Sequence, residues 1–266
     1  MSYRRLPFEE YFINTGEDFN HTGRMTRRVE YTACSYCSGR LSKLFGVRHE
    51  VNYEIYYDGE RDAIQINFQR TVGFSDWFAN VFESSAKYYD AIDFEGGKLQ
   101  LRVHHGWGDM YRAVKWQIRN GWKELHDLHP EAETEIIGWS LGSGIASHCA
   151  QDLNYNFGLK PYLYTYGSVR PFKSTRGNKA AMRRYLDGLC TRAFNFADVN
   201  DLISYMPPFR GFMMIKRVDL GSSVRRTLPR LLKPLRYHTH YDRPELYRGV
   251  EGLIREPSAS AGKQAK

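Results

Sequence analysis

Apolar and polar residues alternate along some segments of the chain and follow a helical period along others. Alternation predicts two strands, over 51–57 and 63–68, joined by a turn at Asp58-Gly59. Beyond residue 99 the two patterns follow one another in turn. The further elements expected there are strands over 99–103, 133–138, 162–167, 191–196 and 211–218, and helices over 109–128, 141–153 and 178–189. Such an order is typical of an α/β fold with a mostly parallel sheet flanked by helices.

Near the start of the chain the apolar spacing is helical. It predicts a helix over 29–45 that ends at Gly46. Residues 1–28 are polar and mixed, so we expect an irregular N-terminal arm, and the small polar residues of 255–266 predict a disordered tail. The segment between them, 29–254, suits one large α/β domain better than two.

The composition supports a folded domain and adds a basic charge. Tyr, Phe and Trp are abundant (19, 15 and 5 residues), and no stretch approaches the roughly 20 apolar residues of a membrane span. The 38 Lys and Arg outweigh the 30 Asp and Glu, which gives a net charge of +8. No compact basic helix with interleaved aromatics is visible. A solvated basic face is therefore favoured over a nucleic-acid site, and peripheral contact with an anionic membrane stays open.

The first residues of the chain contain basic side chains but no apolar stretch typical of a secretion signal. We therefore expect a cytoplasmic protein. Four cysteines, Cys34, Cys37, Cys149 and Cys190, do not make a disulfide framework in a chain of this length. Cys34 and Cys37 have the spacing of a metal or redox pair, but no second pair and no neighbouring histidine pair accompany them. Buried small side chains are expected there, with no metal and no cofactor.

The most distinctive stretch is Gly138-Trp139-Ser140-Leu141-Gly142, which lies between a predicted strand and a predicted helix. Gly-x-Ser-x-Gly in that context is typical of a sharp turn that exposes a nucleophilic serine. A side chain at either glycine would strike the neighbouring strand or helix. The helix behind the turn directs unpaired N–H groups toward the serine, where they would stabilise a negative oxygen. The pattern predicts Ser140 as a nucleophile.

A serine nucleophile needs a basic histidine that a carboxylate orients. In this class of fold the acid follows the serine in the chain and the histidine comes last. The histidines after Ser140 are His148, His238 and His240. His148 lies two turns into the helix that the serine begins, so we expect a structural role for it. The base is therefore His238 or His240.

The acid is expected in the loop after the strand at 191–196. Asp198 and Asp201 both lie there. Carboxylates at the carboxyl ends of parallel strands share one rim with the nucleophile, although aspartate is also common in turns. The spacing leaves both residues open as the acid.

Several blocks resemble those of the class 3 lipases, an α/β-hydrolase family that includes the fungal triacylglycerol lipases. The serine turn is similar to the family's Gly-His-Ser-Leu-Gly-Gly segment. The other similar blocks, in order, are Phe68-Gln69-Arg70-Thr71 with Asp76-Trp77, His104-His105-Gly106-Trp107, the segments 164–170 and 200–208, and His238-Thr239-His240-Tyr241. Together they cover about residues 29–247, and they imply an α/β-hydrolase fold.

The resemblance also implies which side chains act. It assigns Ser140 as the nucleophile. It assigns Asp201, not Asp198, as the acid, because Asp201 aligns with the family's Asn-Asp-x-Val-x-x-x-Pro-Pro block. It favours His238 over His240 as the base, because a tyrosine follows His238 by three residues as in the family.

For the oxyanion hole, the resemblance implies the backbone N–H groups of Leu141 and Thr71. The chain departs from the family at three nearby positions. Trp139 replaces the histidine before the serine, Ser143 replaces a glycine, and Arg70 replaces the glycine before Thr71. A bulky side chain at Arg70 is expected to narrow the acyl site or to shift the Thr71 amide. The substrate range is therefore the property least transferable from the family.

The segment 74–90 contains an apolar stripe at helical spacing, formed by Trp77, Phe78, Val81 and Phe82. It is interpreted either as ordinary core or as a lid over a substrate groove.

The resemblance implies a carboxylic ester hydrolase that works through an acyl-enzyme, with an acylglycerol or phospholipid as its substrate, as in a triacylglycerol lipase or a phospholipase A1. A hypothesis of another class is a catalytically silent hydrolase fold that binds an anionic membrane or nucleic acid through its basic surface. Arg70 and the basic segment 216–236 motivate it.

Overall fold

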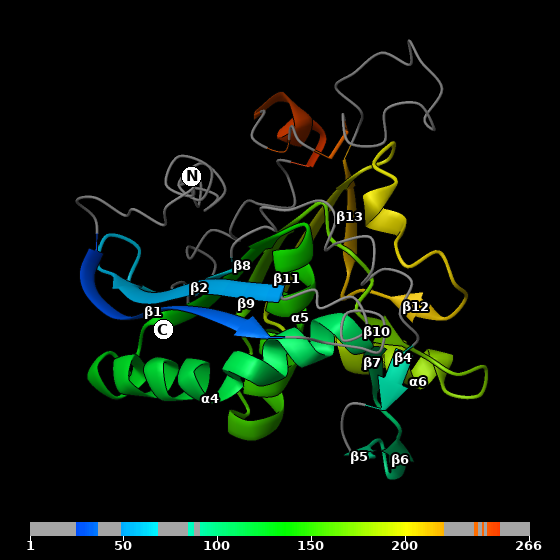
Figure 1. The fold of residues 1–266 in the computed structure, drawn as a ribbon, viewed down its shortest axis with the longest axis horizontal. Coiled ribbons are helices and arrows are strands. Elements are labelled where there is room, and N and C mark those ends of the chain that lie inside the picture. Colours follow the sequence, from blue (N-terminus) through cyan, green and yellow to red (C-terminus); the bar gives the residue numbers. More distant parts are fainter. Residues whose placement is uncertain are drawn as a thin grey trace, which may run out of the picture.

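The computed structural model describes residues 25–36, 49–68, 85–87, 91–220, 237–238, 241 and 244–250. These residues form a seven-stranded main sheet, a four-stranded small sheet, a two-stranded ribbon and the helices α4, α5 and α6 (Figure 1).

The main sheet has the strand order β1-β2-β3-β8-β9-β11-β13. Its strands are β1 (Met25–Tyr36), β2 (His49–Asp58), β3 (Ala63–Phe68), β8 (Glu133–Trp139), β9 (Tyr162–Tyr166), β11 (Arg192–Asp198) and β13 (Arg217–Leu220). From β3 to β13 every neighbouring pair is parallel, whereas β1, β2 and β3 pair in antiparallel fashion. The predicted α/β fold with a mostly parallel sheet is therefore confirmed.

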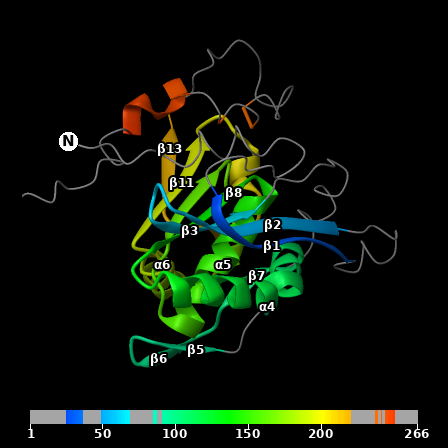
Figure 2. The same cartoon turned by 90° about the vertical axis from the view of Figure 1, so that its left-hand side faces the viewer.

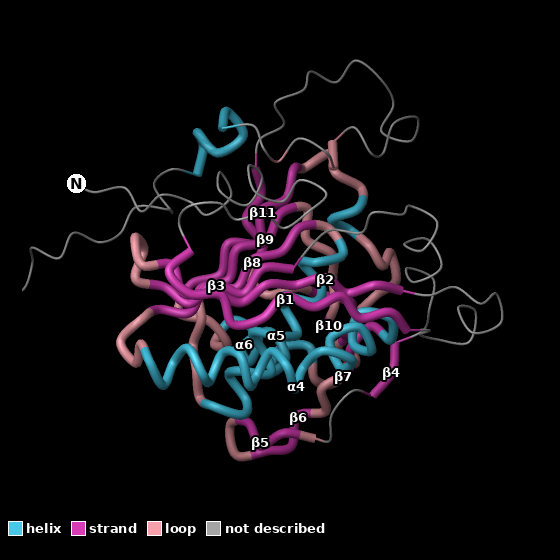
Figure 3. Tube along the Cα trace, turned by 60° about the vertical axis from the view of Figure 1, so that its left-hand side comes forward, coloured by secondary structure: helices cyan, strands magenta, loops and turns pink. Residues whose placement is uncertain are grey.

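The three helices are α4 (His105–Leu128), α5 (Leu141–Phe157) and α6 (Lys179–Asp187). They lie on one side of the main sheet (Figures 2 and 3). The apolar stripe of α4, with Val114, Ile118 and Leu125, is fully buried in the core between helices and sheet. Burial of one such side chain contributes about 1.5–3 kcal/mol, so the stripe fixes which face of α4 meets the sheet.

The other face of the main sheet is covered differently. The short helix η2 (Pro244–Val250) packs there against the aromatic side chains of β9 and β11. Tyr247, for example, lies edge-on to Phe196, with 5.1 Å between the ring centroids. The end of the described chain is thus held against the parallel half of the sheet.

The small sheet has the order β12-β10-β7-β4. Its strands are β4 (Ser85–Lys87), β7 (Arg102–His104), β10 (Phe172–Lys173) and β12 (Phe212–Met213), and β5 (Ile92–Phe94) pairs with β6 (Gly97–Leu99) to form the ribbon. Along the chain, β4, β10 and β12 follow the carboxyl ends of β3, β9 and β11. The small sheet therefore gathers segments that leave one edge of the main sheet.

Most expected elements are present. The strand over 63–68 agrees with β3 at both ends, and the strands expected at 133–138, 162–167 and 191–196 correspond to β8, β9 and β11. The helices expected at 109–128, 141–153 and 178–189 correspond to α4, α5 and α6, of which α4 begins earlier and α5 ends later than predicted.

The predicted helix over 29–45 is wrong over residues 29–36, and residues 37–45 lie outside the described residues. The chain is a strand from Met25 to Tyr36 and pairs along its length with β2, because a partner strand of matching register outweighs the local spacing of apolar residues. Cys34 therefore lies in a strand, and β1 begins within the segment 1–28 expected to be irregular. The division into an arm, a domain over 29–254 and a tail over 255–266 stays a prediction, since the tail lies outside the described residues.

Two other expected strands are divided. The strand expected over 99–103 separates into the end of β6, which pairs back to β5, and β7, which pairs with β4 and β10. The strand expected over 211–218 separates into β12 of the small sheet and β13 of the main sheet. The two parts of each expected strand belong to different sheets, which the pattern of residues along the chain does not reveal.

Among the described residues, none of the helices combines the length and the apolar character needed to cross a bilayer.

Candidate active site

Ser140 lies at the sharp turn between β8 and α5. Its φ of 55° and ψ of −120° are unusual for a residue with a side chain, and such strain is found mainly at functional positions. The turn is tight, and it brings the backbones of Gly138 and Gly142 close together. A Cβ added at Gly138 would lie 2.4 Å from the carbonyl oxygen of Gly142. The Ser140 N–H donates to the Tyr166 carbonyl of β9 at 2.9 Å, which anchors the turn to the sheet.

The Ser140 hydroxyl belongs to a chain of hydrogen bonds. Its Oγ lies 2.6 Å from Nε2 of His238, and Nδ1 of His238 lies 2.8 Å from Oδ2 of Asp201. Asp201 is fully buried and His238 is nearly so, which excludes water from their contact. The structure thus brings together the three side chains that the sequence had selected from positions about a hundred residues apart in the chain.

Asp201 reaches this site from the loop after β11. Its Oδ1 accepts the Ile203 N–H at 2.9 Å, and its own N–H donates to the Asp198 carbonyl at 3.0 Å. One carboxylate oxygen therefore fixes the loop while the other faces His238. Because β8 and β11 run parallel, Ser140 and Asp201 emerge at the same edge of the main sheet.

Tyr241 holds the Asp201 side chain in place. Its hydroxyl donates to Oδ2 of Asp201 at 2.7 Å and accepts the Asp198 N–H at 2.8 Å. Burial, and next the charge of Asp201, raise the pKa of the Tyr241 phenol well above its ordinary value, so the group stays a neutral donor. Sequence reasoning used this tyrosine only to choose between two histidines. Its place in the family's His-x-x-Tyr block was the available signal.

Gly167 makes room for the imidazole. It follows β9 with a φ of +56°, and an added Cβ would lie 2.8 Å from Cε1 and 2.9 Å from Nδ1 of His238. Its N–H donates to the Phe196 carbonyl at 2.9 Å, which holds the backbone in place. Sequence reasoning did not select Gly167, although it lies in the block 164–170 that resembles the family.

Two of the departures from the family also lie at this site. The Ser143 hydroxyl donates to the Ser140 carbonyl and accepts the Val169 N–H at 3.2 Å, so it ties the serine turn to the loop after β9. Trp139 is buried beside His238, with 6.2 Å between the centroids of the two rings.

The residues that sequence reasoning set aside lie in other surroundings. The His148 ring is fully buried near Phe172 and Tyr111, with centroid distances of 5.2 and 6.5 Å. Burial, and next the neighbouring His104, lower the pKa of the His148 imidazole to about 3, which keeps it neutral. The Asp198 carboxylate accepts the Asn200 N–H at 2.7 Å and so stabilises the loop.

Several expected participants lie outside the described residues. These are Thr71 of the oxyanion hole, Arg70 before it, His240, and the apolar stripe of Trp77, Phe78, Val81 and Phe82. Leu141, the other expected oxyanion donor, is the first residue of α5. The first N–H groups of a helix have no intrahelical acceptor, so the Leu141 N–H is available beside Ser140.

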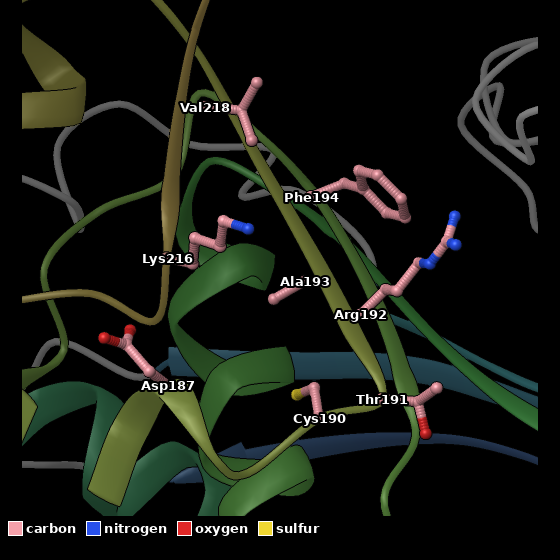
Figure 4. Close-up of a pocket in the computed structure, with 8 residues that line it drawn as sticks. All are labelled: Asp187, Cys190, Thr191, Arg192, Ala193, Phe194, Lys216 and Val218. Carbon is pink, nitrogen blue, oxygen red and sulfur yellow. The ribbon is translucent and has the colours of Figure 1, made fainter. Parts of the chain in front are cut away.

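In the part of the chain that the structure describes, no group of three or more His, Cys, Asp or Glu side chains could hold a metal ion. A pocket of about 200 Å³ lies at the other end of β11 from Asp201 (Figure 4). It is lined by Asp187, Cys190, Thr191, Arg192, Ala193, Phe194, Lys216 and Val218. β13 pairs with β11 only from Asn195 onward, so the pocket occupies the edge of β11 that β13 leaves uncovered.

Comparison with known proteins gives one family. The family model described as Lipase (class 3) matches residues 65–211, more than half of the 266 residues. A search of curated proteins finds no match to the chain.

Solved structures share the fold at low sequence identity. A mutant of MDLA from Penicillium cyclopium superposes with a TM-score of 0.55 at 18% identity, over 75% of this chain and 67% of that one. The lipase–propeptide complex of Rhizomucor miehei gives 0.53 at 18%, over 71% and 57%. A triacylglycerol lipase described as having a serine protease triad as its catalytic centre gives 0.53 at 18%, over 73% and 67%. This chain therefore spans 57–67% of the length of these three proteins.

Proposed function

The chain belongs to the class 3 lipase family, and from this premise we propose that it is a serine hydrolase that cleaves carboxylic esters. The observation that carries the proposal is the continuous chain of hydrogen bonds from Ser140 through His238 to Asp201. A buried carboxylate, an imidazole and a hydroxyl in this order are the groups that activate a serine for acyl transfer.

In the proposed reaction, Oγ of Ser140 attacks the ester carbonyl carbon while its proton moves to Nε2 of His238, 2.6 Å away. Asp201 stabilises the imidazolium through Nδ1. The bond to the alcohol then breaks, and the alcohol leaves with the proton held by His238. Water, deprotonated by the same imidazole, attacks the acyl-enzyme and releases the carboxylic acid, which restores Ser140.

The negative oxygen of each tetrahedral intermediate needs donors that are already in place. We assign this role to the N–H of Leu141, which the dipole of α5 assists, and to the N–H of Thr71. Loss of one such donor typically lowers the rate by about 10²–10³-fold.

The substrate class follows from family membership. We propose a lipid ester, either an acylglycerol or a phospholipid, so that the activity is that of a triacylglycerol lipase or a phospholipase A1. No cofactor takes part in the proposed reaction. The cytoplasmic location expected from the sequence stays a prediction, which fractionation of cells that express the tagged chain would test.

The proposal is tested with the wild type and Ser140→Ala on a p-nitrophenyl ester and with a fluorophosphonate probe. We expect the probe to label Ser140, and we expect the substitution to lower the rate by about 10⁴-fold or more, because the nucleophile is lost. Ser147→Ala is the matched control, since the Ser147 hydroxyl is buried two turns further along α5 and donates to the Ser143 carbonyl. Equal rates for wild type and Ser140→Ala would contradict the proposal.

The same experiment addresses the alternative of a silent hydrolase fold. If the probe labels no serine and the chain binds anionic vesicles or DNA in a salt-sensitive way, the fold acts as a binding module. A labelled Ser140 excludes that reading.

A further inference from the structure

Two cations face each other in the small sheet. Arg102 of β7 is directly opposite Lys173 of β10 in the antiparallel register, and Lys87 of β4 is the register partner of Arg102 on its other side. Residues directly opposite in an antiparallel pair have side chains on the same face with Cβ atoms about 4.5–5.5 Å apart, and like charges there are destabilising. This arrangement opposes folding unless something compensates it.

No carboxylate does so within the described residues. Lys173 places its ammonium 4.8 Å from the centroid of the Phe212 ring, and neither it nor Arg102 has an ion pair in that part of the chain. Burial, and next the charge of Arg102, lower the pKa of the Lys173 ammonium. Exposed cations elsewhere do have carboxylate partners, as Lys98 has Asp93.

The same situation recurs three residues before Lys173. The Arg170 guanidinium lies 5.2 Å from the centroid of the Tyr205 ring and has no ion pair within the described residues, while the Arg217 guanidinium, which pairs with Asp219, lies 4.5 Å from that centroid. Burial, and next the charge of Arg217, lower the pKa of Arg170. Each of the two cations in the segment 170–173 therefore lies near an arginine of a different strand.

Exposed aromatic side chains accompany these cations. Tyr205 is 36% exposed and Phe209, in the turn before β12, is 47% exposed. Aromatic rings and basic side chains together are typical of surfaces that lie at the boundary between lipid and water. This combination distinguishes the region from a simple site for free phosphate.

The position of the region relative to Ser140 is also favourable. β10 and β12 follow β9 and β11, the strands whose carboxyl ends carry Gly167 and Asp201. The strands of the small sheet lie together at the start of α4 (Figure 1). A substrate that reaches Ser140 must approach the edge of the main sheet from which these segments leave.

We propose that Arg102, Arg170 and Lys173 form a cationic surface that receives the phosphate groups of anionic membrane lipids and docks the protein on the membrane that holds its substrate. The inference rests on the proposed function for its choice of a lipid surface. The phosphates would supply the negative charge that no carboxylate of the described residues provides to Arg102, Arg170 and Lys173 through an ion pair, and Phe209 would enter the headgroup layer.

The test is binding of the full chain to phosphatidylcholine vesicles with and without phosphatidylserine. We expect binding only with phosphatidylserine. The variant Arg102→Gln/Arg170→Gln/Lys173→Gln should bind on the order of 100-fold more weakly, since each basic side chain near an anionic surface contributes about 1 kcal/mol, or roughly fivefold. The matched control removes three cations that already have carboxylate partners: Lys98→Gln/Arg112→Gln/Arg184→Gln.

Further variants separate docking from other effects. The charge-preserving Arg102→Lys/Arg170→Lys/Lys173→Arg should bind as the wild type does, and thermal melting checks that the glutamine variant folds. Phe209→Ser should weaken binding to vesicles severalfold. Ser140→Ala should bind as the wild type does, so that failure of the docking surface and failure of the proposed catalysis are distinguishable.

Three outcomes would overturn the inference. One is that the wild type ignores phosphatidylserine. Another is that the glutamine variant and its control lose binding equally. The third is that the wild type binds inorganic phosphate but no vesicle.

Discussion

His238 and His148 are both buried, yet the two regions treat an imidazole in opposite ways. His238 lies between the Ser140 hydroxyl and the Asp201 carboxylate at the edge of the main sheet. His148 lies inside α5 among aromatic rings, next to His104, and its pKa falls to about 3. A proton on Nδ1 of His238 faces the Asp201 carboxylate at 2.8 Å, whereas a proton on His148 would be buried beside the Phe172 ring and near a second imidazole, that of His104.

The difference shows that burial alone does not suit a histidine to the role proposed for His238. Removal from water penalises the charged form, and only a carboxylate at hydrogen-bond distance offsets that penalty. The site at the edge of the sheet can therefore stabilise a transient imidazolium, whereas the buried face of α5 disfavours one. The contrast can be tested by changing His148, His238 or the residues that contact His238 and Asp201.

The largest effect is expected when His238 is replaced by an apolar residue. Replacement of His148 provides the comparison. His238→Ala should lower kcat/KM by about 10⁴-fold or more, because the base is lost. His148→Leu should leave kcat/KM within about twofold and change the free energy of unfolding by about 1–3 kcal/mol, because it changes a buried side chain that makes no contact with Ser140 or Asp201. Ester hydrolysis and thermal melting measure the two effects. If His148→Leu abolished hydrolysis in a folded protein, the contrast would be wrong.

The next effect concerns the space around His238. Gly167→Ala should lower kcat by about 10²-fold, because the added methyl group would lie 2.8 Å from Cε1 and displace the ring by a fraction of an ångström or more. Gly158→Ala is the matched control, since Gly158 also has a positive φ, of +66°, but nothing lies within 4 Å of its added Cβ. Steady-state kinetics of both variants separate the clash from backbone strain. Similar rates in the two would remove the steric argument.

A third effect is expected on stability as the pH falls. The His148 pKa is about 3 in the folded protein and near 6.5 when the chain is unfolded, so between these values the unfolded state binds the extra proton. This stabilising contribution is fully present above pH 6.5 and is lost as the pH falls toward 3, by about 1.4 kcal/mol per pH unit. Denaturant unfolding between pH 7 and pH 5 measures the slope. His148→Leu should flatten it by one proton, and an unchanged slope would argue against a neutral His148.

The smallest effect is expected at Tyr241. Tyr241→Phe removes the hydroxyl that donates to Asp201 at 2.7 Å and accepts from the Asp198 backbone. We expect a loss of kcat of about tenfold, because a hydrogen bond to a charged group contributes about 1.5–3 kcal/mol and part of that orients the acid. Tyr185→Phe is the control, since its buried hydroxyl accepts from Gln151 away from the site. A kcat for Tyr241→Phe equal to that of the control would show that Asp201 needs no such support.

The parallel half of the fold could be predicted because its signals are local. Runs such as Ile136-Ile137 ending in Gly138, and the apolar stripe of α4, each specify one element without reference to distant residues. The edge strand β1 could not be predicted in this way. The residues of β1 carry helical spacing, and only their pairing with β2 makes them a strand.

The candidate site likewise contains residues that the sequence identified and residues that only the folded chain revealed. The order of serine, acid and histidine along the chain, with the resemblance to a family, was enough to select Ser140, Asp201 and His238 from the alternatives. Gly167 and Tyr241 were missed because their roles depend on distances that only the folded chain defines. Gly167 is required by a ring 71 positions away, and no spacing rule connects the two.

The late start of β13 has a consequence for how copies of the protein meet. Because β13 covers β11 only from Asn195 onward, the preceding stretch of β11 has no partner strand on that side among the described residues, and such an edge is a template for pairing with another molecule. Lys216 and Arg192 flank this edge (Figure 4). Charged side chains, lysine above all, commonly oppose edge-to-edge pairing of strands, so we expect Lys216 to disfavour such a contact between copies.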